Sequence, residues 1–266
     1  MQTALTIAGS DSGGGAGIQA DLRTFQALGV YGTCAITAVT AQNTLGVRAV
    51  QAIDAAIVAA QIDAVAEDFS IAATKIGMLA NADIIRVVAA ALGRHHLGPI
   101  VLDPVMVAKG GAKLLDEQAS EALVALIRGR ATLITPNLAE AQVLTGLEIA
   151  NERQMRAALA PLLAMGAQAV LLKGGHLDGS DVVDIFSDGR TTREWRAAKI
   201  ETRHTHGTGC TLASAIAAGI AQGLDMIAAI ERARLYVRRA IETAPGFGQG
   251  HGPLNHGHPF KGSDID

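Results

Sequence analysis

The sequence predicts an α/β fold with a mostly parallel central sheet and helices on both of its faces. Short runs rich in β-branched residues alternate with longer segments whose apolar residues recur at helical spacing, which is typical of parallel sheets joined by helices. The chain has 266 residues, of which 49% are hydrophobic and 18% are charged. This composition can fill one large core, so we expect a single domain over residues 1–266.

The first two thirds of the chain supply the predicted parallel strands. They are expected at residues 4–8, 33–40, 74–78, 100–103, 132–135 and 169–173. A helix is predicted over residues 18–28, where the apolar residues share one face and Gly29 supplies the C-terminal stop. A second helix is predicted over residues 54–69, which carry one apolar stripe.

The pattern changes in the last third of the chain. Asn151, followed three residues later by Gln154, resembles a capping box that opens a helix, and Gly166 closes this helix. Residues 181–187 and 193–200, joined by a tight Asp-Gly turn, predict a β-hairpin.

A loop over residues 204–210, two Ala-rich helices and a Gly- and His-rich tail over residues 246–266 complete the chain. We expect this tail to be loop. The loop and the tail each contain a His-x-His pair, which could suggest a metal site. We expect solvated loop histidines instead, because no cysteine or carboxylate cluster completes a ligand set; these residues are His204, His206, His256 and His258.

Composition limits the partners and the compartment. The chain has 22 Lys and Arg against 25 Asp and Glu, a formal net charge of −3, and 3% aromatic residues. It therefore offers neither a cationic surplus nor stacking platforms for nucleic acid. The two cysteines make no disulfide framework, which fits a reducing cytoplasm. The N-terminus shows no targeting pattern and no apolar run reaches ~18 residues, so we expect a cytoplasmic protein outside the membrane.

A glycine-rich loop over residues 9–17 lies between the first predicted strand and the first helix. Ligands of open α/β sheets bind at such a place, because backbone N–H groups and the helix dipole converge there. The loop satisfies a loose dinucleotide pattern, but no Asp or Glu between Asp21 and Asp54 could hold a ribose hydroxyl. No Lys follows a Gly, which excludes a P-loop, and no Gly-x-Ser-x-Gly elbow exists for a hydrolase nucleophile.

A second glycine loop, over residues 204–211, opens an Ala-rich helix. Gly207 and Gly209 let consecutive N–H groups point into one concavity, which suits the charge that develops on a transferring phosphoryl group. An ordinary helix cap is the alternative interpretation.

Several motifs follow one another in chain order, and their combination is far more specific than any one of them. They are the loop at 9–17 with its continuation to Asp21, Gln42-Asn43, Lys75-Ile-Gly-Met78, Leu102-Asp-Pro-Val-Met106, Thr135-Pro-Asn-Leu-Ala-Glu140, Leu172-Lys-Gly-Gly-His176 and Thr205-His-Gly-Thr-Gly-Cys210. From about residue 4 to the C-terminus the chain resembles the hydroxymethylpyrimidine/phosphomethylpyrimidine kinases of thiamine biosynthesis, which have the ribokinase-like three-layer fold. The resemblance implies an ATP- and Mg²⁺-dependent kinase. Its substrates would be 4-amino-5-hydroxymethyl-2-methylpyrimidine, phosphorylated on the hydroxymethyl group, and the monophosphate, converted to the pyrophosphate.

The resemblance also implies roles for particular residues. Gln42 would hydrogen-bond the pyrimidine, because an amide offers a donor and an acceptor to a heteroaromatic edge. Asp103 and Glu140 would organise Mg²⁺, since carboxylates suit a hard ion. The pyrimidine pocket would be lined by Gly9, Asp21, Met78 and Val105. The ATP phosphates would lie beside Lys173, Asn137, Thr208 and Gly209, and the catalytic groups would be Cys210, Gly207, Gly209 and Lys173.

Cys210 stands where most ribokinase-like kinases carry an Asp that takes the hydroxyl proton. A thiol at a helix N-terminus has its pKa lowered from about 8.5, so a thiolate base is one interpretation. Alternatively, Cys210 acts by shape, because phosphoryl transfer is driven mainly by positioning and electrostatics.

Other interpretations stay open as well. Asp103 could cap a loop, Glu140 could occupy a first helical turn for its dipole alone, and Met78 and Val105 could belong to the core. A pyridoxine or pyridoxal kinase on the same fold is the nearest alternative function. A catalytically silent ligand-binding regulator is another, although the second-loop glycines and the two acids argue against it. The expected partners are a small pyrimidine and ATP, and a homodimer is compatible with the sequence.

Overall fold

Nine strands form one sheet in the computed structural model, which describes residues 1–106, 116–175, 177 and 179–260. The strands are β1 (Thr3–Asp11), β2 (Tyr31–Asn43), β3 (Gly46–Ala52), β4 (Ile71–Ile76), β5 (Ile100–Leu102), β6 (Leu133–Ile134), β7 (Ala169–Lys173), β8 (Asp181–Ser187) and β9 (Thr192–Ala198). Their order is β3-β2-β1-β4-β5-β6-β7-β8-β9. The pairings β2–β3, β7–β8 and β8–β9 are antiparallel, and all other neighbours are parallel.

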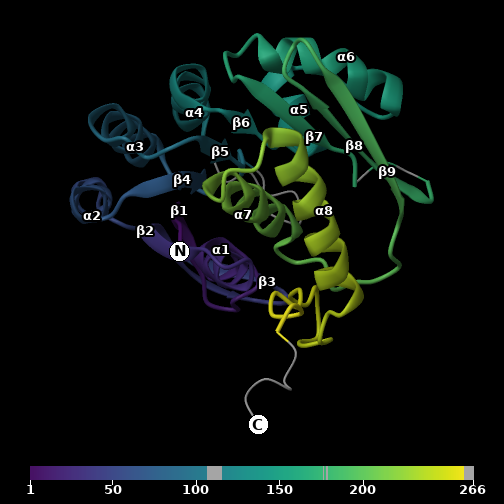
Figure 1. The fold of residues 1–266 in the computed structure, drawn as a ribbon, viewed down its shortest axis with the longest axis horizontal. Helices are drawn as coiled ribbons and strands as arrows, with labels where there is room; N and C mark the ends of the chain where they lie inside the picture. The colour runs from purple at the N-terminus through teal and green to yellow at the C-terminus, as the bar shows by residue number, and fades with distance from the viewer. Residues whose placement is uncertain (107–115, 176, 178, 261–266) are drawn as a thin grey trace.

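Helices cover both faces of this sheet (Figure 1). The helices α1 (Gly17–Ala27), α7 (Thr208–Ala221) and α8 (Met226–Glu242) share one buried apolar cluster with the sheet. A second cluster packs the other helices: α2 (Ala55–Asp68), α3 (Ala82–Arg94), α4 (Glu117–Arg130), α5 (Leu138–Thr145) and α6 (Glu152–Leu163). The predicted three-layer α/β fold with a mostly parallel sheet is therefore confirmed.

The chain fills the sheet first on one side of β1 and then on the other. From β1 it runs outward through β2 to β3, and it then returns to β4 on the other side of β1 and continues toward β9. The connections after β1 and β4 therefore diverge and leave a crevice at their carboxyl ends, where ligands of open α/β sheets bind. The first glycine loop follows β1 directly, so it borders this crevice.

The six predicted parallel strands and the hairpin are all present, and β7 has the predicted bounds. The edge strand β3 has no counterpart among the predictions. Six of its seven residues are exposed and the last is half-buried, so its sequence lacks the alternation that marks a half-buried strand.

Side-chain caps confirm two of the predicted helix starts, those of α2 and α6. The side chain of Asp54 accepts a hydrogen bond from the N–H of Ala56, and the side chain of Asn151 accepts one from Gln154. The capping box at Asn151 is only half formed, because Oε1 of Gln154 accepts from the N–H of Ala150 (2.8 Å) instead of that of Asn151.

The described part of the tail packs against α7 and α8. Leu254 and His256 are buried, Nε2 of His256 lies 2.9 Å from Oγ1 of Thr211, and the hydroxyl of Tyr236 donates to the carbonyl of His256 (2.7 Å). The expectation of a solvated histidine is therefore wrong for His256, whose burial lowers its pKa to about 4. The last residues, 261–266, lie outside the described part.

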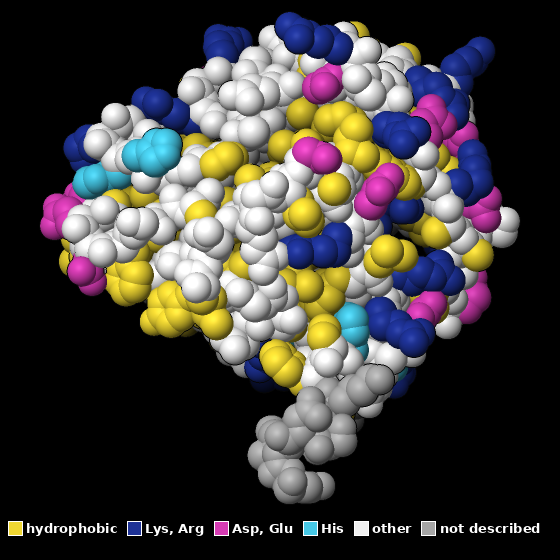
Figure 2. Space-filling model, in the orientation of Figure 1, with side chains coloured by type: hydrophobic (Ala, Val, Ile, Leu, Met, Phe, Trp, Pro, Cys, Tyr) yellow, Lys and Arg dark blue, Asp and Glu magenta, His cyan; other side chains and the backbone are white. Residues whose placement is uncertain are grey.

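Charged side chains of both signs are interspersed on the face shown in Figure 2. Arginines of the helices and of β9 contact acids: Arg156 of α6 and Arg196 of β9 reach Glu152 (3.1 and 2.7 Å), and Arg238 of α8 reaches Glu242 (3.0 Å). Within the described ranges, no helix combines the length and apolar character needed to span a bilayer.

Candidate active site

The carboxylate of Asp11, at the end of β1, organises the first glycine loop. It accepts hydrogen bonds from three backbone N–H groups, those of Gly13 (2.8 Å), Gly15 (3.1 Å) and Ala16 (2.9 Å). Gly17 begins α1 with φ +58°, and a Cβ at this position would overlap the carbonyl oxygen of Gly9. The sharp turn from strand to helix therefore depends on Asp11 and on a glycine at position 17.

A cavity of about 190 Å³ opens beside this loop, at the crevice after β1 and β4. Its volume lies below the ~300–1,000 Å³ of drug-sized ligand sites, so it fits a single small ring. The lining includes five of the predicted site residues: Gly9, Gln42, Met78, Val105 and Cys210. It also includes residues that were not assigned from the sequence, among them Asp11, Lys75 and His206.

Asp21 was expected to line the pyrimidine pocket, but it is completely buried behind the cavity wall. Its carboxylate lies 2.8 Å from the ammonium of Lys75, which does line the cavity, and it accepts hydrogen bonds from the hydroxyls of Thr6 (2.6 Å) and Ser214 (2.5 Å). Burial opposes the charge of Lys75, but the carboxylate of Asp21 raises the pKa of Lys75 above its ordinary value. Lys75 therefore presents a fixed positive charge, with Asp21 as its support.

The second glycine loop meets the first one. Gly207 precedes α7 with φ +84°, and a Cβ there would overlap the carbonyl oxygen of Gly15. The hydroxyl and the backbone N–H of Thr208 both donate to the carbonyl of Thr205 (2.9 and 3.4 Å). No side chain caps the start of α7, so the next backbone N–H groups of its first turn point out of the helix start. The geometry therefore combines the helix-cap interpretation with an anion-binding one.

Buried charges gather beside the start of α7. Nζ of Lys173, at the end of β7, donates to Oδ1 of Asp103 (2.8 Å), which also accepts from the hydroxyl of Thr135 (3.0 Å). A Cβ at Gly209 would lie 3.1 Å from that Nζ and 3.5 Å from Oδ2 of Asp103. Burial opposes the charge of Lys173, but the carboxylates of Asp103 and Glu140 raise the pKa of Lys173.

Glu140 and Asn137 have a local structural role. They form the capping box of α5, in which the N–H of Asn137 donates to Glu140 (2.8 Å) and the N–H of Glu140 donates to Asn137 (3.0 Å). Burial raises the pKa of Glu140 to about 7, with Asp103 adding to the effect and Lys173 opposing it. The negative charge of Glu140 is therefore only partly compensated by its surroundings.

Asp103 and Glu140 suit a divalent cation. Each is only 3% exposed, and each offers hard carboxylate oxygens, which Mg²⁺ prefers. A cation would also compensate the charge that burial disfavours at Glu140. Over the described ranges, no group of three or more His, Cys, Asp or Glu side chains could hold a metal ion. Mg²⁺ is usually held by one or two carboxylates together with substrate phosphates and water.

Cys210 is half-buried in the first turn of α7 and lines the cavity. Burial raises the pKa of the Cys210 thiol, and the opposing effect of Lys75 does not reverse this, which favours the interpretation that Cys210 acts by shape. The thiol is therefore protonated at neutral pH in the ligand-free protein.

His206 is another residue whose expected solvation is wrong. It lines the cavity, and its Nε2 lies 2.8 Å from Oδ2 of Asp11 and 3.2 Å from Nε2 of Gln42. The motif around it was visible in the sequence. Its pairing with Asp11, 195 residues away, was not.

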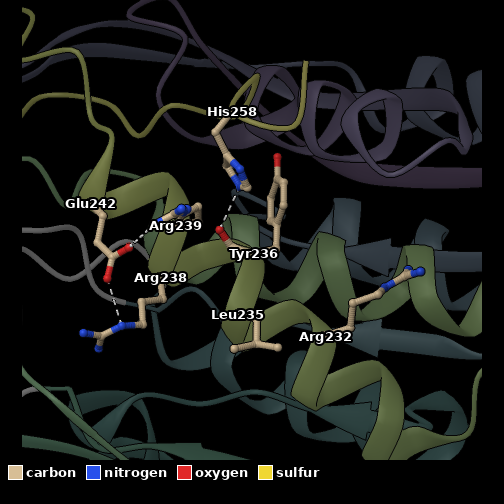
Figure 3. Close-up of a pocket in the computed structure, with 7 residues that line it drawn as sticks. All are labelled: Arg232, Leu235, Tyr236, Arg238, Arg239, Glu242 and His258. Atoms are coloured by element: carbon tan, nitrogen blue, oxygen red, sulfur yellow. Dashed lines mark hydrogen bonds and ion pairs between the residues drawn. The ribbon is translucent and has the colours of Figure 1, made fainter. Parts of the chain in front are cut away.

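A shallow second depression lies over α8 (Figure 3). Its basic residues Arg238 and Arg239 both contact Glu242, at 3.0 and 3.2 Å, and His258 contacts the carbonyl of Tyr236 (3.1 Å). None of the predicted site residues lines it, so it is distinct from the cavity after β1 and β4.

A helix start that can hold phosphate, directly beside a ring-sized cavity on an open α/β sheet, is the arrangement of kinases that act on small molecules. The model of the phosphomethylpyrimidine kinase family matches residues 11–255, and the chain belongs to this family. A kinase of this family uses ATP as co-substrate.

Individual relatives agree with the family. A hydroxymethylpyrimidine/phosphomethylpyrimidine kinase from Rhizobium meliloti (strain 1021) is 51% identical over 96% of this chain and 97% of its own. Among solved structures, a phosphomethylpyrimidine kinase from Clostridium difficile 630 has 42% identity and a TM-score of 0.81, covering 91% of this chain and 100% of its own. An ADP complex of pyridoxal kinase from Bacillus subtilis has 39% identity and a TM-score of 0.90, covering 96% and 97%.

Proposed function

We propose that this protein uses ATP and Mg²⁺ to phosphorylate the hydroxymethyl group of 4-amino-5-hydroxymethyl-2-methylpyrimidine, and then converts the monophosphate to the pyrophosphate. The observation that carries the proposal is that the ring-sized cavity and the start of α7, where phosphate can bind, lie side by side. Gln42 and Cys210 line one ring-sized cavity, and Cys210 lies in the first turn of α7, the helix whose start lies against Lys173 and Asp103. A hydroxymethyl group of a bound ring can therefore face the transferring phosphoryl group.

Each part of the site has a proposed role. The N–H groups around Gly207 and Gly209, together with Lys173, would stabilise the negative charge on the phosphoryl group in transfer. Thr208 and Asn137 would border the ATP phosphates. Mg²⁺, held through Asp103 and Glu140, would supply further neutralisation of phosphate charge.

Cys210 is proposed to act mainly by shape and position. Its thiol remains protonated in the free protein, because burial raises its pKa. Met78, Val105 and Gly9 would contact the ring, and Asp21 would act only through Lys75.

Pyridoxine or pyridoxal phosphorylation is the second candidate. The solved structure named pyridoxal kinase from Bacillus subtilis superposes with a TM-score of 0.90. Pyridoxine and the pyrimidine both carry a hydroxymethyl group on a small aromatic ring, so the fold alone does not separate the two functions.

The test is a coupled assay of ADP release with four compounds: the hydroxymethylpyrimidine, its monophosphate, pyridoxine and pyridoxal. We expect kcat/KM for the pyrimidine to exceed that for pyridoxine by at least about tenfold, because a buried donor or acceptor left unpaired costs about 1–3 kcal/mol. Gln42→Leu should reduce the pyrimidine rate far more than the pyridoxine rate. The control is Gln51→Leu, since Gln51 lies on β3 and outside the cavity lining. Equal losses on both rings would favour the pyridoxine function.

The proposal includes a cytoplasmic location and a homodimer. The free thiols of Cys34 and Cys210 support a reducing compartment. Sedimentation velocity of the purified chain tests the dimer, and a single species with the mass of one chain would refute it.

A further inference from the structure

The amide of Gln42 lies between two polar neighbours in the cavity wall. Its Nε2 is 3.2 Å from Nε2 of His206, and its Oε1 is 3.3 Å from the hydroxyl of Thr40. The same nitrogen of His206 is 2.8 Å from Oδ2 of Asp11, and the hydroxyl of Thr40 is 3.0 Å from the carbonyl of Ser10. The protons available at these atoms determine which way the amide can point.

The proton on His206 faces Asp11. Burial alone would raise the pKa of Asp11, but the hydrogen bond and charge of His206 lower it below its ordinary value. An ionised carboxylate only accepts hydrogen bonds, so Nε2 of His206 must carry the proton and donate. The amide N–H groups of Gln42 would then face another N–H group.

The Thr40 side has the complementary conflict. The hydroxyl has one proton but faces two acceptors, the carbonyl of Ser10 and Oε1 of Gln42. A half turn of the amide exchanges its nitrogen and oxygen, which have nearly the same shape; it removes the contact between two N–H groups and leaves the Thr40 proton with one acceptor. The single proton on Nε2 of His206 is then shared between Oδ2 of Asp11 (2.8 Å) and the nearby amide oxygen. The oxygen of Gln42 then accepts from His206, and its nitrogen donates to Thr40, whose proton stays on Ser10.

We propose that His206, held by Asp11, is a positioning residue that fixes the amide of Gln42 with its oxygen toward His206 and its nitrogen toward Thr40, and so selects the ring edge that the cavity accepts. One N–H and one oxygen lone pair remain for a ligand. They match a ring nitrogen beside an exocyclic amine, with the amine on the His206 side and the ring nitrogen on the Thr40 side.

His206 is well placed for this task because several segments hold it. Its backbone N–H donates to the carbonyl of Gly252 (3.1 Å), which ties it to the C-terminal segment. Its ring packs on Gly15, where a Cβ would lie 2.6 Å from Cδ2 of His206. Asp11, which holds the imidazole, is itself fixed by the backbone N–H groups of the first glycine loop.

The inference rests on the proposed function, and its test compares two substrates. One is the 4-amino pyrimidine, and the other is its 4-oxo analogue, in which a ring N–H beside a carbonyl reverses the donor and acceptor. Wild type should prefer the amino compound by about 100-fold or more in kcat/KM, as expected for a site built to pair with one polar edge. In His206→Leu the amide can turn freely, so this ratio should fall to about tenfold or less.

A second variant approaches the amide from the other side. Thr40→Val removes the acceptor that holds the amide nitrogen and leaves both glycine loops intact, so it should lower the same ratio even if His206→Leu does not fold. His251→Leu is the matched control, because His251 lines the same cavity but its Nδ1 contacts the carbonyl of Arg203 (3.0 Å). The ratio should stay at the wild-type value in this control.

The outcomes separate the inference from the proposed function. A wild-type protein that phosphorylates neither pyrimidine overturns the proposed function. An active wild type without preference for the amino compound, or equal losses on both compounds in His206→Leu and Thr40→Val, overturns the positioning role. In a Gln42→Leu background, His206→Leu should cause no further change in the ratio.

Discussion

Asp21 and Lys75 form an ion pair with no exposed surface, so Asp21→Asn tests how the wall of the cavity is held together. The two oxygens of Asp21 lie 3.0 and 2.8 Å from the ammonium, and each also accepts a hydroxyl hydrogen bond, one from Ser214 and one from Thr6. Asn keeps the shape of the side chain but removes its charge. Lys75 would then be a buried cation without a counter-charge.

The expected loss is large. Removing one partner of a buried ion pair typically costs about 3–5 kcal/mol. With a urea m-value of about 3 kcal/mol/M, the unfolding midpoint of Asp21→Asn should fall by about 1–1.7 M. Asp83→Asn is the control, because Asp83 and Arg86 form an exposed ion pair with side chains 76% and 59% accessible, and its midpoint should not change.

The loss should also depend on pH. In wild type, burial opposes the charge of Lys75, but Asp21 raises the pKa of Lys75 above its ordinary value. The contribution of the ion pair to the free energy of unfolding is therefore fully present below the ordinary lysine pKa of about 10.4, and it is lost as pH rises through the folded-state pKa. In Asp21→Asn burial should prevail and lower that pKa. The unfolded variant then binds the proton more tightly than the folded one, so its stability should increase as pH rises toward 10.

Urea unfolding followed by circular dichroism at pH 7 and pH 10 measures both effects. The gap between wild type and Asp21→Asn should be wide at pH 7 and narrower at pH 10. Asp21→Asn combined with Lys75→Met should recover part of the lost midpoint, because no unpaired charge remains. A midpoint change under about 0.3 M at pH 7, or the same gap at both pH values, would refute the reasoning.

Three further predictions concern the phosphate half of the site. A Cβ at position 207 would overlap the carbonyl oxygen of Gly15, so Gly207→Ala should lower kcat at least about 100-fold. Gly223 has a similar φ (+85°) but open space around it, so Gly223→Ala should reduce the free energy of unfolding by about 1–2 kcal/mol and leave kcat unchanged. Steady-state kinetics and urea unfolding of both variants test this. Glu140→Gln can keep the capping box while losing the charge, so its melting temperature should stay within a few degrees while kcat falls at least about tenfold. Because burial raises the pKa of Glu140 to about 7, the affinity of wild type for Mg²⁺ should weaken as pH falls below 7. Mg²⁺ titrations in which Glu140→Gln shows the same pH dependence as wild type would contradict this role. Because burial raises the pKa of the Cys210 thiol, the rate of its alkylation by iodoacetamide, measured by mass spectrometry, should keep increasing as pH rises past 9. A rate that levels off below pH 8 would instead indicate an activated thiol.

The parallel strands and glycine loops could be predicted because their signals are local. A short β-branched run, a glycine at a forced turn and an Asn or Asp at a helix start each report the backbone within a few residues. The roles of Gln42 in β2 and Cys210 in α7 were inferred instead from the resemblance of the motifs that contain them. The edge strand β3 lacks such a signal, because its exposed residues do not alternate in burial.

The partners of buried charges could not be predicted in the same way. Asp21 and Lys75 are 54 residues apart, and their contact depends on α1 packing on β1, the strand that lies beside β4 in the sheet. One local sign was present, because Ile18, Asp21 and Phe25 share the buried face of α1, so the carboxylate falls on an apolar stripe. A charged residue on such a stripe needs a buried counter-charge, and this reasoning places Asp21 in the interior instead of in the pocket wall.

Cys210 shows how tertiary burial overrides a local rule. The helix start favours a thiolate, and Lys75 lowers the pKa further, but the cost of moving the charged form out of water is larger and raises the pKa. That balance depends on water reaching the cavity, so a bound ring would exclude water and bury the thiol more deeply. The raised pKa therefore favours a role of Cys210 in shape and position, which is consistent with a site that works by positioning charge around a loose transition state.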